Sequence, residues 1–164
     1  MSLNWDQAAA QTLRDAGLKA TPQRIAVLRA LDGDETHPTA QELFERLQGE
    51  FPTLSVATVY NTLSALTRMS RCVPLELGGP VRFDPNVTAH DHAVCERCGR
   101  IRDVLQPSTG AASDHSAASG VPATASTAHS ITGESLAGFE VRRVERIYRG
   151  FCAQCSEAAE SVAE

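Results

Sequence analysis

The chain has 164 residues, a formal net charge of −5 and five cysteines. This length fits one domain or two small ones, and the acidic total does not favour nucleic-acid binding through bulk charge. We find no signal peptide and no apolar run long enough to cross a bilayer, so we expect a cytoplasmic protein without membrane contact. In that compartment a C-x-x-C pair is more often a metal or redox site than a disulfide.

Two helices are predicted at the start of the chain. The first covers residues 5–16 and ends at Gly17. Thr21 and Pro22 begin the second helix, because Thr is a favoured N-cap and Pro suits the first helical position. Its predicted core-facing residues are Ile25, Leu28 and Leu31.

Two further helices follow. Thr39 and Glu42 form a capping box for the third. Ser55 begins the fourth, whose apolar stripe predicts a face against a core. The stripe consists of Val56, Val59, Leu63 and Leu66. The opposite face is small and polar, and it carries Ala57, Asn61, Ser64 and Arg68.

A β-hairpin is predicted over residues 73–84, with a tight turn at Gly78-Gly79. Helices followed by a two-stranded ribbon are the order of a winged helix-turn-helix. We therefore assign residues 1–84 to a winged-helix domain, 85–89 to a hinge and 90–164 to a second, small α/β domain. The predicted fold class is α+β.

In the second half, residues 101–105 and 139–148 have the pattern of strands. Residues 107–138 are rich in Ser, Ala, Thr and Gly and predict a loop or a partly disordered insertion. A short helix over 123–137 is a further expectation.

Four of the cysteines form two C-x-x-C pairs, which is the usual composition of a closed tetrahedral zinc site. The long segment between the pairs means that the fold has to bring them together. Two redox dithiols or unrelated buried thiols are the alternatives. The proposed zinc ligands are Cys95, Cys98, Cys152 and Cys155, whereas Cys72 stands alone and is expected in the core.

A second group of donors precedes the first pair. His90 and His92 are two residues apart, so on a strand they share one face and both can approach one ion. Asp91 then points to the other face, where we expect it to be solvated or to accept a hydrogen bond from a residue that binds the metal. Taken alone, His37 is a surface-loop histidine and Asp84 a turn residue.

The exposed face of the fourth predicted helix is the candidate DNA contact. Lys19, Arg24 and Arg68 are available for phosphates, and Tyr60 and Asn61 for base edges or phosphates in a major groove. Thr58 flanks the same face. An ordinary solvated helix face is the alternative.

Several stretches together resemble the ferric uptake regulator family. They are residues 18–24, 37–40, 55–63 and 82–84, and His90-Asp91-His92 leading into Cys95. The resemblance implies a homodimeric, metal-dependent repressor that binds a palindromic operator in double-stranded DNA. It also implies an N-terminal winged helix and a C-terminal dimerisation domain.

Within the family the chain looks most like the peroxide-sensing branch. That likeness implies a regulatory Mn(II) or Fe(II) held by His37, Asp84, His90, His92 and Asp103. The iron-sensing branch has a second site that uses histidines where this chain has Ala89 and Val144.

The sequence leaves several functions open. Peroxide sensing through histidine oxidation and plain manganese or iron homeostasis use the same ligands. A hydrolase or oxygenase is disfavoured, because no base or nucleophile accompanies the ligands and five ligands leave little open coordination. We therefore expect no enzyme. A zinc-held binding module or metal store that does not touch DNA is a further alternative.

Overall fold

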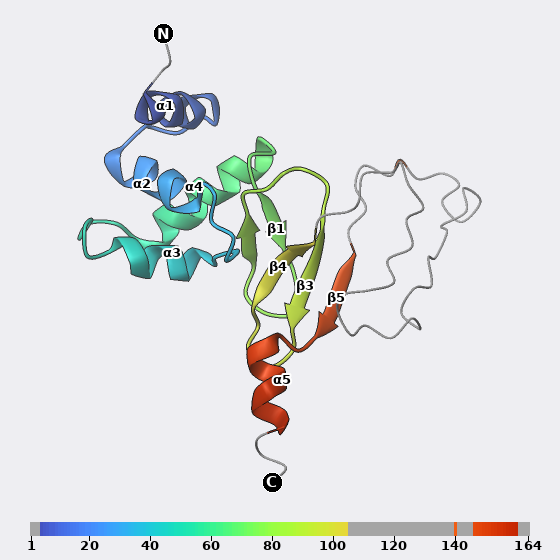
Figure 1. Ribbon diagram of the computed structural model, residues 1–164. Helices are drawn as coiled ribbons and strands as arrows, with labels where there is room; N and C mark the ends of the chain where they lie inside the picture. Colours follow the sequence, from blue (N-terminus) through green and yellow to red (C-terminus); the bar gives the residue numbers. More distant parts are fainter. Residues whose placement is uncertain (1–3, 105–139, 141–145, 161–164) are drawn as a thin grey trace.

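The computed structural model of the chain describes residues 4–104, 140 and 146–160. Four helices come first, then a two-stranded hairpin, a three-stranded sheet and a final helix (Figure 1). This is the predicted α+β class. No helix within these residues is both long and apolar enough to cross a membrane.

The first two helices are α1 (Trp5–Asp15) and α2 (Pro22–Leu31). Both helix starts agree with the prediction, and the Thr21 hydroxyl accepts the Arg24 backbone N–H at 3.4 Å. The predicted core face of α2 is only partly right. Val27 and Leu31 are buried, whereas Ile25 and Leu28 are half-buried.

Helices α3 (Ala40–Leu47) and α4 (Val56–Arg68) follow. The capping box of α3 is present in both directions, and the Ser55 hydroxyl caps α4 by accepting the Thr58 N–H. Val59, Leu63 and Leu66 are buried as predicted. The prediction was wrong for Val56, which is 37% exposed. It lies in the first turn of α4, before the helix reaches the core.

The hairpin pairs β1 (Val73–Leu75) with β2 (Arg82–Asp84) in antiparallel register, Val73 opposite Asp84. The connection is longer than the predicted two-residue turn, although Gly78 has a positive φ of 91°. Phe83 joins the helical core. Its N–H donates to the Pro38 carbonyl at 2.9 Å, which attaches the α2–α3 loop to β2.

The second sheet has the order β4-β3-β5. Its strands are β3 (Asp91–Cys95), β4 (Ile101–Val104) and β5 (Ile147–Gly150). The central strand β3 pairs antiparallel with β4 and parallel with β5. The final helix α5 (Ala153–Glu160) was not predicted.

The predicted strand over 139–148 overlaps β5 at Ile147 and Tyr148 only, and residues 141–145 lie outside the described part. The predicted insertion at 107–138 and the short helix at 123–137 lie outside it as well.

Candidate metal centres and nucleic-acid interface

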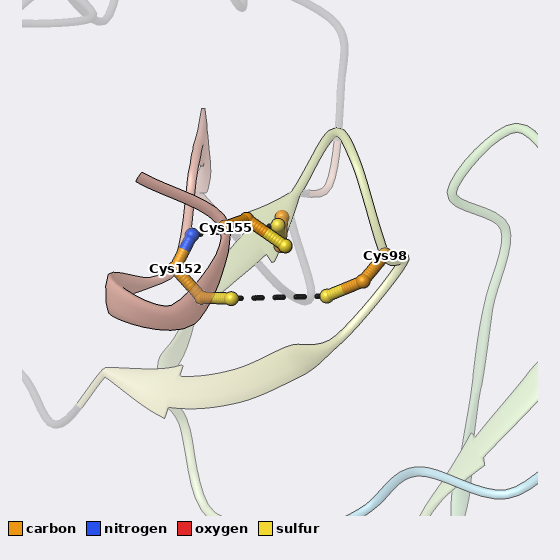
Figure 2. Close-up of side chains that lie close together, drawn as sticks. Cys98, Cys152 and Cys155 are labelled. Carbon is orange, nitrogen blue, oxygen red and sulfur yellow. Dashed lines mark hydrogen bonds between the residues drawn. The ribbon is translucent and has the colours of Figure 1, made fainter. Parts of the chain in front are cut away.

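The two C-x-x-C pairs meet, as predicted. Cys95 ends β3 and Cys98 lies in the β3–β4 turn, while Cys152 directly precedes α5 and Cys155 lies in its first turn. Figure 2 shows the sulfurs of Cys98 and Cys152 facing each other, at a separation of 3.8 Å. Four sulfurs placed tetrahedrally about 2.3 Å from one zinc ion lie about 3.8 Å apart. The cluster therefore has the dimension of a closed zinc site.

The thiols of this cluster have pKa values shifted in opposite directions. Backbone N–H groups of Cys152, Cys98 and Arg97 aim at the Cys95 sulfur and lower the pKa of its thiol to about 6. The Cys152 N–H lies 3.4 Å from it. Hydrogen bonding among the sulfurs, with Cys152 first, raises the pKa of Cys155 to about 12. Several thiolates close together repel one another, and a divalent cation bound between them would stabilise their negative charges.

A second cluster gathers four buried donors. One atom each from His37, Asp84, His90 and His92 lies within 4.8 Å of the others. The first two come from the α2–α3 loop and β2, and the last two from β3 and the residue before it. The Nε2 atoms of His90 and His92 are 3.0 Å apart, and an Asp84 oxygen lies 3.1 Å and 3.4 Å from them.

Asp103 completes the predicted set from β4, where it pairs with His92. Its carboxylate lies 2.7 Å from His37 Nε2 and 3.5 Å from His90 Nε2. Burial acts to raise the pKa of Asp103, but the Asn86 amide at 3.1 Å and the nearby imidazoles outweigh it and lower the pKa. The carboxylate is therefore kept ionised.

These donors fit a divalent cation. His37 Nε2, Asp84 Oδ2 and Asp103 Oδ1 are buried and form no hydrogen bond of normal geometry, although they lie close together. Such atoms are costly unless something satisfies them. Two nitrogens about 2.1 Å from one ion, at right angles, are about 3.0 Å apart. Imidazoles combined with carboxylates suit manganese, iron or zinc.

The ring orientation of His90 and the neutral form of His92 also favour cation binding. His90 Nδ1 lies 2.7 Å from the Thr88 carbonyl, which leaves Nε2 directed at the cluster. Burial, and then the neighbouring His90, lower the pKa of His92 and favour its neutral form. Neutral imidazole is the form that binds metal.

Asp91 lies on the opposite side of β3 from these donors, as predicted. The expectation that it is solvated was wrong, because it is only 2% exposed. It accepts hydrogen bonds from the Arg146 N–H at 3.2 Å and the Tyr148 hydroxyl at 3.4 Å. The parallel strand β5, whose pairing the sequence does not show, covers it.

The predicted DNA-contact residues differ in availability. Four of them are exposed to solvent: Lys19, Tyr60, Asn61 and Arg68. Tyr60 is 50% exposed, and its ring forms a T-shaped contact with that of Phe83. The remaining two are engaged locally. Arg24 donates to the Lys19 carbonyl at 2.9 Å, and the Thr58 hydroxyl lies 3.0 Å from that of Ser55.

Sequence reasoning missed two residues that contact the second cluster. Arg82 donates to the His37 carbonyl at 2.9 Å, and Asn86 donates to Asp103. Arg82 lies far from its partner along the chain, so spacing carries no signal for it. Asn86 had a weak local signal, because its N–H bonds the carboxylate of Asp84 two residues earlier.

A model of the ferric uptake regulator family matches residues 15–132, which is most of the chain. The chain belongs to the ferric uptake regulator family. It is 44% identical over 97 residues to the peroxide-responsive repressor PerR of Staphylococcus aureus, and the match covers 58% of this chain. The matched segment spans 66% of that relative, slightly less than two thirds.

Solved family structures have the same fold. The ferric uptake regulator of Helicobacter pylori superposes with a TM-score of 0.66 at 18% identity, covering 93% of this chain and 91% of that one. The Vibrio cholerae regulator superposes with a TM-score of 0.60 at 25% identity, covering 87% and 98%. The Helicobacter pylori regulator has three functional metal binding sites.

Proposed function

We propose that the protein is a homodimeric, metal-dependent transcriptional repressor, and not an enzyme, which acts in the cytoplasm on a palindromic site in double-stranded DNA. The observation that carries this proposal is the convergence of His37 and Asp84 with His90, His92 and Asp103. Two of these donors belong to the helices and hairpin, and three to the second sheet. When bound, a divalent cation supplies the positive charge that joins both groups.

We assign these two parts to the domains expected from the sequence. Residues 1–84 form the winged-helix DNA-binding domain, 85–89 the hinge, and 90–164 the dimerisation and metal-binding domain with its insertion at 107–138. Helix α4 reads the major groove through Tyr60 and Asn61. Lys19, Arg24 and Arg68 contact phosphates, and Thr58 lies beside them on the DNA-binding face.

The two clusters have different roles. Cys95, Cys98, Cys152 and Cys155 hold a structural zinc ion that keeps the second sheet folded. The buried histidines and aspartates hold exchangeable Mn(II) or Fe(II). A cation favours DNA binding only through higher affinity for the DNA-competent arrangement, so DNA tightens cation binding by the same factor.

The experiment compares metal-free and Mn(II)-loaded protein. A duplex is first selected from random-sequence DNA with Mn(II)-loaded protein and is then titrated in gel-shift assays. We expect chelation to weaken binding by roughly 5–150-fold, the usual range of allosteric coupling. His37→Ala should remove this response, whereas Arg46→Gln, which lies outside the cluster, should retain it. Equal affinity with and without Mn(II) contradicts the proposal.

We further propose that the signal is peroxide. The support is the match to peroxide-responsive repressors of Staphylococcus aureus, together with the three imidazoles in the cluster. With Fe(II)-loaded protein, one oxygen atom of hydrogen peroxide would be added to the His37 or His90 imidazole while the other oxygen leaves as water, and loss of that imidazole as a ligand would release DNA.

Peptide mass spectrometry tests this after peroxide treatment of Fe(II)- and Mn(II)-loaded protein. Oxygen addition to a His37 or His90 peptide is expected with iron alone. Unmodified peptides in both samples leave the second candidate, a regulator of manganese or iron homeostasis that does not sense peroxide.

A further inference from the structure

The loop that carries His37 has an unusual backbone. His37 has a φ of +54°, and Ser70 is the other non-glycine residue with positive φ in the described part of the chain. A side chain destabilises this left-handed conformation, so surrounding contacts have to maintain it. The His37 ring is almost fully buried and points at Asp84 and Asp103. The direction of the ring therefore depends on what holds this backbone.

Arg82 supplies the side-chain contact to the His37 carbonyl, beside the backbone bond from the Phe83 N–H to the Pro38 carbonyl. One guanidinium nitrogen, Nη1, donates to the His37 carbonyl at 2.9 Å and to Glu42 Oε2 at 3.2 Å. The other, Nη2, lies 3.5 Å from Glu42 Oε1. Two contacts to one carboxylate thus fix the plane of the guanidinium, and the second Nη1 hydrogen points at the His37 carbonyl.

The position of Arg82 on β2 links two donors of the cluster. Arg82 and Asp84 are two residues apart on one strand, so their side chains leave β2 on the same face. Phe83 between them packs into the helical core. One short strand therefore supplies the carboxylate that faces the His37 ring and the cation that holds the His37 carbonyl.

Glu42 connects the same contact to α3. Its carboxylate accepts the Thr39 N–H at 2.8 Å in the capping box, while it also binds Arg82. The Arg82–Glu42 pair is partly exposed, with side-chain exposures of 26% and 41%, so its own contribution to stability is small. The Arg82–Glu42 pair matters because it orients the guanidinium toward the His37 carbonyl.

We propose that Arg82 is the positioning residue of the exchangeable metal site. Clamped by Glu42, it holds the His37 backbone in its left-handed conformation and so directs the imidazole at Asp84 and Asp103. This inference rests on the proposed function only in taking His37 as a ligand. It adds a physical connection from the cluster, through Glu42, to the beginning of α3.

The test is a double-mutant cycle on Mn(II) affinity with full-length, zinc-loaded protein. Removing a group that orients a metal ligand typically costs 10–100-fold in affinity. We expect Arg82→Gln to weaken Mn(II) binding by this factor when His37 is present. In the His37→Ala background the same substitution should change affinity by about twofold or less, because its effect passes through His37.

A spectroscopic measurement separates positioning from general destabilisation. The visible absorption of Co(II)-loaded Arg82→Gln should shift toward that of His37→Ala, since both lose the His37 nitrogen. Arg82→Lys should recover part of the Mn(II) affinity, because one ammonium can reach the carbonyl without the fork.

Arg46→Gln is the matched control. Arg46 binds Asp34 and Thr36 in the same loop but does not contact His37, so this variant should retain wild-type affinity and spectrum. Urea unfolding of every variant reports whether it folds.

Additive effects of Arg82→Gln and His37→Ala overturn the positioning role, as does an unchanged Co(II) spectrum in folded Arg82→Gln. Either outcome would still be consistent with the proposed metal site, provided that His37→Ala alone weakens Mn(II) binding. An unchanged affinity in His37→Ala instead contradicts the proposed site itself.

Discussion

Substitution of Cys152 by Ser should unfold the second sheet and leave the helices folded. In the described part of that sheet, the buried apolar side chains are Val94, Cys95 and Ile101. Burying one aliphatic side chain contributes about 1.5–3 kcal/mol, so Val94 and Ile101 together contribute roughly 3–6 kcal/mol. A structural zinc ion contributes about 10–16 kcal/mol in apparent terms, which makes it the larger stabilising factor.

The helices have a separate core, centred on residues such as Val27, Leu43 and Leu63, which the cysteine cluster does not touch. We therefore expect loss of zinc and loss of amide hydrogen-exchange protection in β3, β4 and β5, with protection retained in α2, α3 and α4. Elemental analysis and residue-resolved exchange measure both.

Cys72→Ala is the matched control, because Cys72 is buried in the helical core. It should lower helix stability while keeping zinc and the sheet. Full protection of β3 in zinc-free Cys152→Ser would refute the reasoning.

Asp91→Ala removes the acceptor of the Tyr148 hydroxyl and the Arg146 N–H, so urea unfolding should show a loss of about 1–3 kcal/mol; an unchanged midpoint speaks against a structural role. Arg68→Ala should weaken DNA binding uniformly and reduce the salt slope by about 1, and a steeper or unchanged slope excludes a phosphate contact. Hydrogen bonds from Thr36, and then Arg46, overcome burial and lower the pKa of Asp34. Its stabilising effect is therefore present above about pH 4 and disappears as pH falls through the lowered pKa, so Asp34→Asn should destabilise at pH 6 and progressively less in acid.

The local signals in the sequence predicted much of the helical part. Thr21, Thr39 and Ser55 are N-caps where their side chains predicted them, because a capping hydroxyl serves backbone groups two or three residues away. Periodicity was less reliable at helix ends, as Val56 shows. Apolar periodicity predicts which side of a helix faces the core, but it does not predict at which turn of the helix the contact with the core begins.

The long-range contacts were harder to predict. The parallel pairing of β5 with β3 joins segments more than fifty residues apart, and it buries Asp91. Spacing alone indicated the four cysteines and the pair His90 and His92. It did not indicate that His37 or Asp84 would reach them, which only the family resemblance implied. Nor did any local pattern indicate the Arg82 contact to the His37 carbonyl.

In the proposed function, one exchangeable cation joins the two parts of the chain in the arrangement that binds DNA. The most direct test measures the Mn(II) dissociation constant with and without the selected duplex, beside the duplex dissociation constant with and without Mn(II). Both ratios should exceed about fivefold and equal each other, since coupling is reciprocal. A Mn(II) affinity that does not change when saturating duplex is added would contradict the claim.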